Sequence, residues 1–291
     1  MELLQLRYFQ TVAKLGSITG AANFYRIPQS SMSQTIQRLE RELGDAKLFD
    51  RRNGRVFLND QGKLFLEYVN RILEDLDSGV RVVMGAETEI AGPLRLKVME
   101  NHRLVLTCIP HFLELYPNVQ FSISHGYCEE RDACYDLCIS SHTEFRQLTA
   151  YVPLLKENLI LAVHEEHPLA VRETVSVSDL RGQKLIATPE QSVLHKIIVS
   201  RCQQQGFTPQ IPIICDDPYF IRKYVSENLG AAVAPEISWK GRFRKNTRLI
   251  PFAEKDMEIS SYILWNKNRH LPLAAVKFQE YLLKEADKLK K

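Results

Sequence analysis

Residues 29 to 41 carry side chains that can form hydrogen bonds with the edges of bases. Within this segment Met32, Ile36 and Leu39 recur at intervals of four and three residues, the spacing of one buried helix face. The opposite face carries neutral polar side chains and arginines: Ser30, Gln34, Gln37, Arg38 and Arg41. Amide and hydroxyl groups both donate to and accept from base edges, so the pattern favours DNA contact over the polar surface of an ordinary helix.

The residues before this helix predict its partner in a helix-turn-helix. A first helix is expected from Leu3 to Lys14, and Gly16 offers the left-handed conformation that ends a helix. Ser17 then caps a second short helix, in which an Ala-Ala pair allows close packing. Two short helices joined by a tight turn are typical of a DNA-binding motif.

Residues 48 to 58 predict a short hairpin, or wing, with Asn53-Gly54 at its turn. Arg51, Arg52 and Arg55 lie on this hairpin and concentrate positive charge there. Beside a helix-turn-helix, such arginines are placed to contact phosphates or a minor groove. The alternative is that they serve only as solubilising charge.

A long helix is expected from Asp60 to Ala86, with Asn59 as its cap. Apolar residues along it approximate a heptad seam: Phe65, Val69, Ile72, Leu76 and Val83. Residues 1–58 are few to cover such a seam, so we expect this helix to pair with a second copy of the chain. The alternative is that it packs on its own domain.

The segment Glu-Ile-Ala-Gly-Pro at residues 89–93 breaks this helix, and strands then alternate with helices to the end of the sequence. Strands are expected at 94–98, 119–123, 136–139, 159–163, 184–187, 211–214, 231–234 and 262–265. Helices are expected at 104–115, 195–205, 219–227 and 273–288. The alternation predicts an α/β architecture with two lobes and a cleft for a small ligand between them.

Composition limits the classes of protein to which the chain can belong. Hydrophobic residues make up 45% and charged residues 25% of the 291, which excludes a disordered or fibrous class. The net charge of +3 does not by itself argue for nucleic acid. The first residues lack the basic-then-apolar pattern of an export signal, and no apolar run approaches the roughly 20 residues of a membrane span. We therefore expect a cytoplasmic protein that has no membrane partner.

Six cysteines are present, and they form no Cys-x-x-Cys pair with partner histidines. We therefore expect no metal site and no cofactor. Buried, reduced thiols are the default in a cytosolic chain. A redox sensor built on Cys128, Cys134 or Cys138 is the alternative.

Together these features resemble the LysR-type transcriptional regulator family over essentially the whole chain. The N-terminal segments that carry the resemblance are residues 6–9, 17–22, 33–40, 43–44, 48–51 and 60–62, and weaker matches follow at 92–96, 135–139, 167–169 and 230–235. The resemblance implies a winged helix-turn-helix at 1–59 and a linker and dimerisation helix at 60–88. It also implies a hinge at 89–93 and a two-lobed, periplasmic-binding-protein-like effector-binding domain at 94–291.

The resemblance further implies a homodimer or homotetramer that binds double-stranded promoter DNA, with RNA polymerase as a further partner. By position, the major-groove contacts are Gln29, Ser30, Ser33 and Gln34. Arg38 matches a phosphate or base contact and Arg51 a wing contact. Pro28 stands where relatives commonly have serine, and a proline cannot supply a side-chain cap, so the start of the helix is left open.

The resemblance also implies a small-molecule effector. By position, its contacts are Asn101, His102, Ser140, Thr188 and Asp217. Each of these residue types also caps helices or forms turns. His102 and Arg103 favour an anionic effector, whereas Glu100 opposes one.

Two other classes of function are weighed against a regulator. A small-molecule binding or transport protein with N-terminal association helices is opposed by the arginine-bearing wing. An enzyme is opposed by the lack of a nucleophile elbow, a phosphate-binding glycine loop or metal-ligand spacing in the sequence. The run His-Glu-Glu-His at 164–167 precedes Pro168 without helical spacing and is more typical of a solvated turn.

Overall fold

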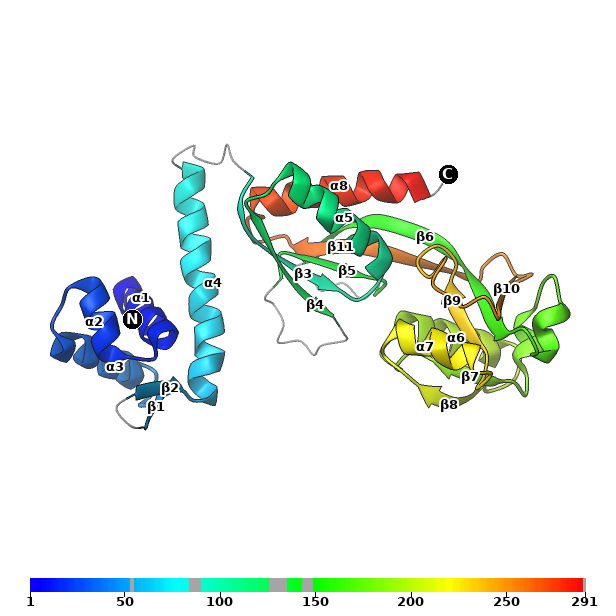
Figure 1. Ribbon diagram of the computed structural model, residues 1–291, viewed down its shortest axis with the longest axis horizontal. Helices are drawn as coiled ribbons and strands as arrows, with labels where there is room; N and C mark the ends of the chain where they lie inside the picture. The colour runs from blue at the N-terminus through cyan, green and yellow to red at the C-terminus, as the bar shows by residue number, and fades with distance from the viewer. Residues whose placement is uncertain (53–54, 84–89, 126–134, 143–148, 290–291) are drawn as a thin grey trace. The chain divides into compact units, whose positions relative to one another are not determined.

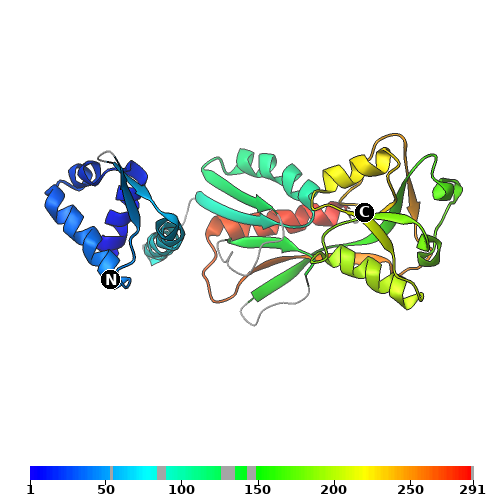
Figure 2. The same cartoon turned by 90° about the horizontal axis from the view of Figure 1, so that it is seen from below.

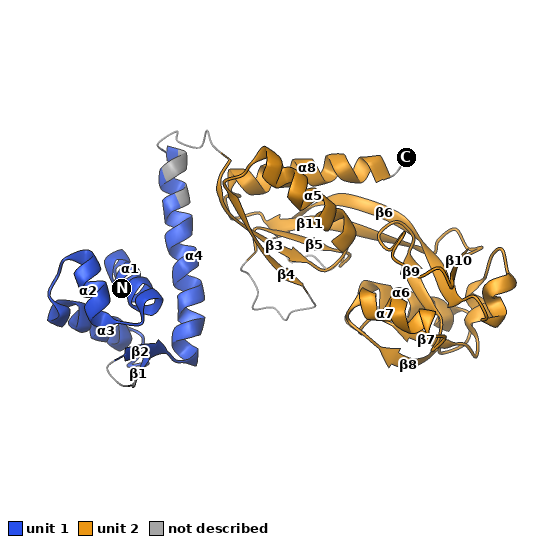
Figure 3. Cartoon of the chain, in the orientation of Figure 1, with its two compact units in different colours: residues 1–89 blue, residues 90–291 orange. Residues whose placement is uncertain are grey.

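The computed structural model describes residues 1–52, 55–83, 90–125, 135–142 and 149–289 (Figure 1). The chain divides into two compact units, residues 1–89 and residues 90–291 (Figure 3). Each unit has its own hydrophobic core. The units are therefore described one at a time.

Unit 1 contains the helices and the wing that the sequence predicts. Its elements are α1 (Leu3–Leu15), α2 (Ile18–Tyr25), α3 (Gln29–Glu42), β1 (Phe49–Arg52), β2 (Arg55–Leu58) and α4 (Asp60–Val83). Gly16 ends α1 in the left-handed conformation, at φ 59°. The Ser17 hydroxyl accepts a hydrogen bond from the backbone N–H of Gly20 at 3.0 Å, which caps α2.

The recognition helix α3 begins directly after Pro28. Proline offers no side-chain cap, but its carbonyl accepts hydrogen bonds from the backbone N–H groups of Ser31 and Met32 at 3.1 and 3.2 Å. This settles the start that the sequence left open. Met32, Ile36 and Leu39 are buried in the core of unit 1, so their side of the helix faces inward, as predicted.

The helix α4 divides its apolar residues between two faces. Val69 and Leu73 are buried against the rest of unit 1, with Phe65 packed beside them. The predicted seam was therefore partly wrong, because Phe65 and Val69 cover the core of their own domain. A separate group of apolar side chains on α4, here called the exposed α4 stripe, is at least one-third exposed: Leu64, Tyr68, Ile72, Leu76, Val80 and Val83. The part of the predicted helix after Val83 lies outside the described residues.

The wing is an antiparallel hairpin. Phe49 pairs with Leu58, and Arg52 pairs with Arg55 at the tip of the ladder. The predicted turn at Asn53-Gly54 lies outside the described residues. A backbone hydrogen bond of 3.2 Å from the N–H of Val56 to the carbonyl of Gly16 ties the wing to the end of α1.

The first lobe of unit 2 is a sheet with the strand order β4-β3-β5-β11-β6. Its strands are β3 (Gly92–Val98), β4 (Val119–His125), β5 (Leu137–Ser140), β11 (Glu258–Asn266) and the first part of β6 (Thr149–His164). The helices α5 (His102–Leu115) and α8 (Leu273–Leu289) pack on this sheet through a shared core. The strand β3 pairs in parallel with both β4 and β5, as expected for an α/β architecture.

The second lobe continues from the second half of β6, which pairs with β9 (Ala232–Pro235) and β10 (Thr247–Pro251) (Figures 1 and 2). Its other elements are β7 (Lys184–Ala187), β8 (Gln210–Ile214), α6 (Val193–Gln204), α7 (Pro218–Ser226) and the 3₁₀ turns η1 (Pro168–Val171) and η2 (Val177–Leu180). Leu161 of β6 packs in the same core as α6, whereas Ile160 packs in the same core as α7. The strand is therefore buried on both faces, and one helix covers each.

Three features differ from the prediction. The strand β10 was missed, and β6 begins ten residues earlier than expected, at Thr149 rather than Leu159. Gly92 and Pro93, expected in the hinge at 89–93, already pair with Val119 and Gln120 as the start of β3. Proline is tolerated there because the described pairing of β3 with β5 begins only at Leu96, so at Pro93 the strand is paired with β4 alone.

Among the described residues, no helix combines the length and apolar character that a membrane span requires.

The two glycines of α4 make a matched pair for testing the packing of this helix. A Cβ atom on Gly62 would lie 2.0 Å from the carbonyl oxygen of Leu48 and 2.9 Å from a methyl carbon of Leu58, whereas one on Gly79 meets nothing within 4 Å. We expect Gly79→Ala to raise the free energy of unfolding by about 1 kcal/mol through helix propensity. We expect Gly62→Ala to lower it by about 1–3 kcal/mol, because backbone must move.

Urea unfolding of the full chain, with hydrogen exchange followed in peptides from residues 1–89, measures both changes. Equal stabilisation by the two alanines would show that the close approach of α4 to Leu48 does not exist.

Candidate DNA-reading surface and inter-lobe cleft

The outward side of α3 presents the residues that the sequence selects for base contact. Ser30, Gln34 and Arg38 follow one another at four-residue intervals and form a single exposed row, here called the α3 row. Gln29 is exposed beside it and Ser33 is half-buried. Because Met32 and Ile36 hold the opposite side in the core, this row is the side of the helix that faces outward.

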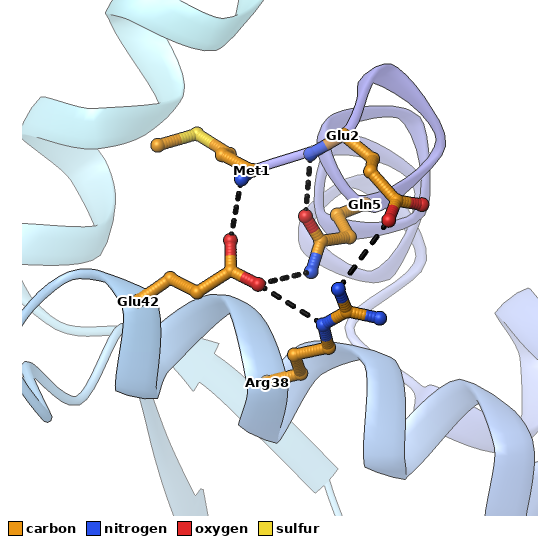
Figure 4. A network of polar contacts seen from close by, with 5 residues as sticks. All are labelled: Met1, Glu2, Gln5, Arg38 and Glu42. Carbon is orange, nitrogen blue, oxygen red and sulfur yellow. Dashed lines mark hydrogen bonds and ion pairs between the residues drawn. The ribbon is translucent and has the colours of Figure 1, made fainter.

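Arg38 is held by a network that joins α1 to the end of α3 (Figure 4). Its Nε lies 3.0 Å from Oε1 of Glu42 and its Nη2 lies 3.4 Å from Oε1 of Glu2. Glu42 also receives a hydrogen bond from the amide of the buried Gln5 at 3.3 Å, and its other oxygen lies 2.7 Å from the amino group of Met1. These contacts, with that of the amino group the largest, lower the pKa of Glu42 to about 2. The network orients the exposed guanidinium at the end of the α3 row toward Glu2 and Glu42.

The wing contributes fewer described side chains to this surface. Arg55 is exposed on β2. Arg51 and Arg52 belong to β1, and their side chains lie outside the described part of the chain. The structure therefore places the backbone of all three predicted wing residues and the side chain of one.

A cleft of about 630 Å³ lies between the two lobes of unit 2. Four of the five predicted effector contacts line it: Asn101, His102, Thr188 and Asp217. Ser140 is not among the lining residues, and its hydroxyl instead accepts a hydrogen bond from the backbone N–H of His142 at 3.1 Å. The role predicted for Ser140 stays a prediction, and the contact that the structure shows for its hydroxyl lies within the segment that follows β5.

Three of the four lining residues, Asn101, Thr188 and Asp217, already have hydrogen-bond partners, and two of these three belong to the second lobe. The Thr188 hydroxyl donates to Ser192 at 2.9 Å. An oxygen of Asp217 accepts a hydrogen bond from the backbone N–H of Tyr219 at 2.7 Å and so caps α7. Asp217 thus combines the two roles that the sequence left open, since it is both a cap and a lining residue.

His102 stands at the start of α5 beside a second imidazole. Its ring centroid is 5.2 Å from that of His125, and both rings line the cleft. Burial, and then the charge of His125, lower the pKa of His102 below its ordinary value. At neutral pH His102 is therefore an uncharged hydrogen-bonding group and not a cation.

Sequence reasoning missed the arginines and the tryptophan of the second lobe. Arg222 on α7 lies with its guanidinium 5.4 Å from the ring centroid of Trp239, and Arg242 follows in the next loop. All three line the cleft. Arg222 and Arg242 stand in a helix and a loop twenty positions apart, so no spacing in the sequence links them.

A buried polar network lies at the crossing between the lobes, and two of its members, Asn101 and Ser238, line the cleft. One oxygen of Glu157, on β6, accepts hydrogen bonds from the backbone N–H groups of Ile237 and Ser238 at 2.7 and 2.8 Å. The Ser238 hydroxyl lies between the other Glu157 oxygen and the amide oxygen of Asn101, whose amide nitrogen donates to Ser261. Asn101 adopts the left-handed conformation, at φ 54°, and only 4% of it is exposed.

Comparison with known proteins places this arrangement in a family. Residues 3–63 match the model of the bacterial regulatory helix-turn-helix protein, lysR family, and residues 87–287 match that of the LysR substrate binding domain. The chain belongs to the LysR family of transcriptional regulators. It is therefore a DNA-binding regulator with a C-terminal effector-binding domain, in a family of regulators and not of enzymes.

Relatives of this LysR-type regulator match it along its length. The transcriptional dual regulator GltC of Bacillus subtilis (strain 168) is 29% identical over 298 residues, which cover 99% of each chain. Full-length CbnR, solved in complex with its target DNA, superposes with a TM-score of 0.66 at 21% identity, over 98% of this chain and 100% of that one. The effector binding domain of QuiR, solved with shikimate, gives a TM-score of 0.60 at 22% identity and covers 68% of this chain and 98% of its own. These two structures confirm the fold.

The cysteines of this LysR-type chain that the structure describes are mostly buried thiols. Burial raises the pKa of Cys108 and of Cys138 to about 12, and that of Cys202 to about 11. A thiol with so high a pKa is a poor nucleophile toward an oxidant at neutral pH, so Cys138 is unsuited to the redox alternative. Cys128 and Cys134, on which that alternative also rests, lie outside the described residues.

Glu157 gives a stability prediction for the crossing. Burial raises its pKa above the ordinary value, so the folded state favours the protonated acid. This contribution to stability is complete below the unfolded pKa of about 4.3 and is lost as the pH rises through the folded pKa. Glu157→Gln should lack that loss, and its stability relative to wild type should therefore increase as the pH rises.

Glu157→Ala should instead cost about 1–3 kcal/mol at every pH, because two backbone N–H groups lose their acceptor. Thermal unfolding between pH 4 and 8 distinguishes the variants, with exposed Glu173→Gln as the control. If Glu157→Gln kept a constant offset from wild type across this range, the carboxyl would not titrate with folding.

Proposed function

We propose that this regulator recognises promoter DNA by placing the α3 row in the major groove and the wing against the adjacent backbone. In this assignment the base contacts come from Gln29, Ser30, Ser33 and Gln34. Arg38, Arg51, Arg52 and Arg55 contact phosphates or a minor groove. The observation that carries the proposal is the exposed α3 row above a buried apolar face, on a helix within the matched helix-turn-helix segment.

Gln34 is the strongest candidate for specificity. It lies in the middle of the α3 row, is exposed, and belongs to the residue type that can pair with adenine through two hydrogen bonds. Arg38 differs because two carboxylates already hold its guanidinium. A phosphate must therefore share or displace these partners, and we assign Arg38 to orientation and charge more than to base choice.

We also propose that the working form is a homodimer or homotetramer. The exposed α4 stripe supports this, since it places apolar side chains along more than four turns of one helix without cover from unit 1. Pairing two such helices would bury the stripe and bring two helix-turn-helix motifs to the two halves of a palindromic site. Because the target is promoter DNA, the place of action is the cytoplasm, and RNA polymerase is a further partner of the DNA-bound form.

For the effector, we propose that a small molecule binds in the inter-lobe cleft. The cleft volume is that of a metabolite site, and its lining combines polar groups from both lobes, among them Asn101, His102, Thr188 and Asp217. CbnR was solved with its target DNA and the QuiR domain with shikimate, which supports both halves of the proposal for a chain of the same fold. A molecule that binds one arrangement of the two lobes more tightly than another shifts the population toward that arrangement. In this way it can alter how the protein binds DNA.

The proposal predicts a change in base preference for Gln34→Ala. Removing the amide should reduce discrimination between base pairs by about 1–3 kcal/mol at one position of the operator. Base preference at the other positions should be unchanged. Fluorescence anisotropy with DNA from upstream of the protein's own gene, and with a library randomised one base pair at a time, measures this. Gln203→Ala, an exposed glutamine on α6, is the matched control.

Binding of wild type should also weaken steeply with salt, because phosphate contacts release counterions. Unchanged base preference in Gln34→Ala would remove Gln34 from the reading surface. Binding no tighter than to random DNA would contradict the proposed DNA-reading role of α3.

A further inference from the structure

We propose that the effector is a small organic anion whose carboxylate or phosphate group binds between Arg222 and Arg242, with an apolar or planar part against Trp239. This inference rests on the proposed function, since it assumes that the inter-lobe cleft holds the effector. It names the chemistry of the effector and assigns its recognition to the second lobe.

The first argument is that two guanidinium groups in the cleft have no acid partner. Among the described residues, neither Arg222 nor Arg242 makes a side-chain hydrogen bond or lies within ion-pair distance of a carboxylate. Arg222 is half-buried on α7, where its guanidinium lies 5.4 Å from the ring centroid of Trp239. Trp239 is itself only 8% exposed, so the ring holds the arginine in a defined position.

The positive charges of Arg222 and Arg242 act on each other across the cleft lining. Burial, and after it the positive charge of Arg242, lower the pKa of Arg222. Arg222 is half-buried whereas Arg242 is exposed, and an anion in contact with both guanidinium groups would offset the repulsion that Arg242 exerts on Arg222. Arginine is the residue that binds carboxylate and phosphate oxygens with paired N–H donors. The cost of holding the two arginines together is therefore offset when an anionic group occupies the site.

The third argument comes from the other charges around the cleft. Asp217 acts on Arg222 from a distance, but one of its oxygens already accepts the N–H that begins α7. Arg103 lines the cleft too, yet its guanidinium donates to the carbonyl of Lys240. His102 is kept neutral by burial. Among the cations of the cleft, the two arginines of the second lobe are therefore the ones whose guanidinium groups make no hydrogen bond to the described residues, whereas Arg103 has already directed one of its N–H donors to the backbone.

The acidic lining residues restrict which chemical groups the rest of the ligand can carry. Asp216 and Asp217 are exposed where β8 leads into α7, on the same lobe as the arginines. Carboxylates there repel a second anionic group and accept hydrogen bonds from a hydroxyl or amino group. The cleft therefore favours an acid with one anionic end, an apolar middle and a hydrogen-bond donor.

The experiment uses the tryptophan that forms the site. The chain has two tryptophans, so Trp265→Phe leaves Trp239 as the sole indole reporter. The probes are inorganic phosphate, 4-hydroxybenzoate and its uncharged analogue 4-hydroxybenzyl alcohol, each compared with sodium chloride at equal ionic strength. We expect saturable change in Trp239 fluorescence with phosphate and with 4-hydroxybenzoate, and none with the alcohol or chloride.

The arginine variants then assign the binding. Arg222→Gln and Arg242→Gln should each weaken 4-hydroxybenzoate binding at least about tenfold, because a charge-assisted contact is lost. Arg181→Gln is the matched control on the same lobe, since Arg181 also lies over an aromatic ring, 4.7 Å from the centroid of Phe207, but outside the cleft. Circular dichroism of each variant confirms that it is folded.

Either of two results would overturn the inference: no saturable response to either anion, or equal affinity in wild type and both cleft arginine variants. Anisotropy with operator DNA on the same preparations separates this result from the proposed function. DNA binding without anion binding contradicts only the arginine site. Anion binding without sequence-selective DNA binding supports the arginine site and contradicts the DNA-reading role.

Discussion

The continuous strand β6 sets the geometry on which the effector-binding unit depends. Its first half pairs with β11 in one lobe and its second half pairs with β9 and β10 in the other. In the second lobe its alternate residues are buried on opposite faces, under α6 on one side and α7 on the other. Because α7 is fixed in this way, Arg222 is directed to the cleft while Ile221 and Val225 are held in the core.

In unit 1 too, the residues that are buried determine which side chains are exposed. Met32 and Ile36 hold α3 against α1 and α2, and the α3 row is what the helix has left to present. Arg38 adds a second layer of order, because Glu42 and Gln5 tie it back to α1. These surface contacts are screened by salt, so the core sets the position of the helix and the ion pairs refine one side chain.

Sequence pattern predicted the elements of this chain best where one face of a helix is apolar and the other polar. The helices of both units were found in this way. The first half of β6 was missed because Pro153 and the polar run Lys156-Glu157-Asn158 interrupt any strand pattern. The structure accommodates the interruption with a register shift between Ser261 and Tyr262 of β11. The strand β10 has the irregular composition of an edge, with exposed Arg248 and Leu249 beside buried Ile250.

Positional reasoning about the cleft relied on loops that end strands, since strand ends meet at one edge of a sheet. Of the residues selected in this way, Asn101, Thr188 and Asp217 line the cleft, whereas the Ser140 hydroxyl accepts a hydrogen bond from His142. It could not find Arg222 with Trp239, because contact between a helix and a distant loop is created only by packing. That pair could be identified only from the structure.

The buried polar network at the crossing between the lobes links a residue of the cleft to the strand that both lobes share. Asn101 lines the cleft, yet its amide is bonded to Ser238 and Ser261. Ser238 in turn is held by Glu157 on the strand shared by both lobes. A ligand that draws the lobes together must therefore either preserve this chain of bonds or break it at a stated cost. Since an orphaned buried donor costs about 1–3 kcal/mol, separating Glu157 from the backbone N–H groups of Ile237 and Ser238 is unfavourable, and the network holds the two lobes together at this point.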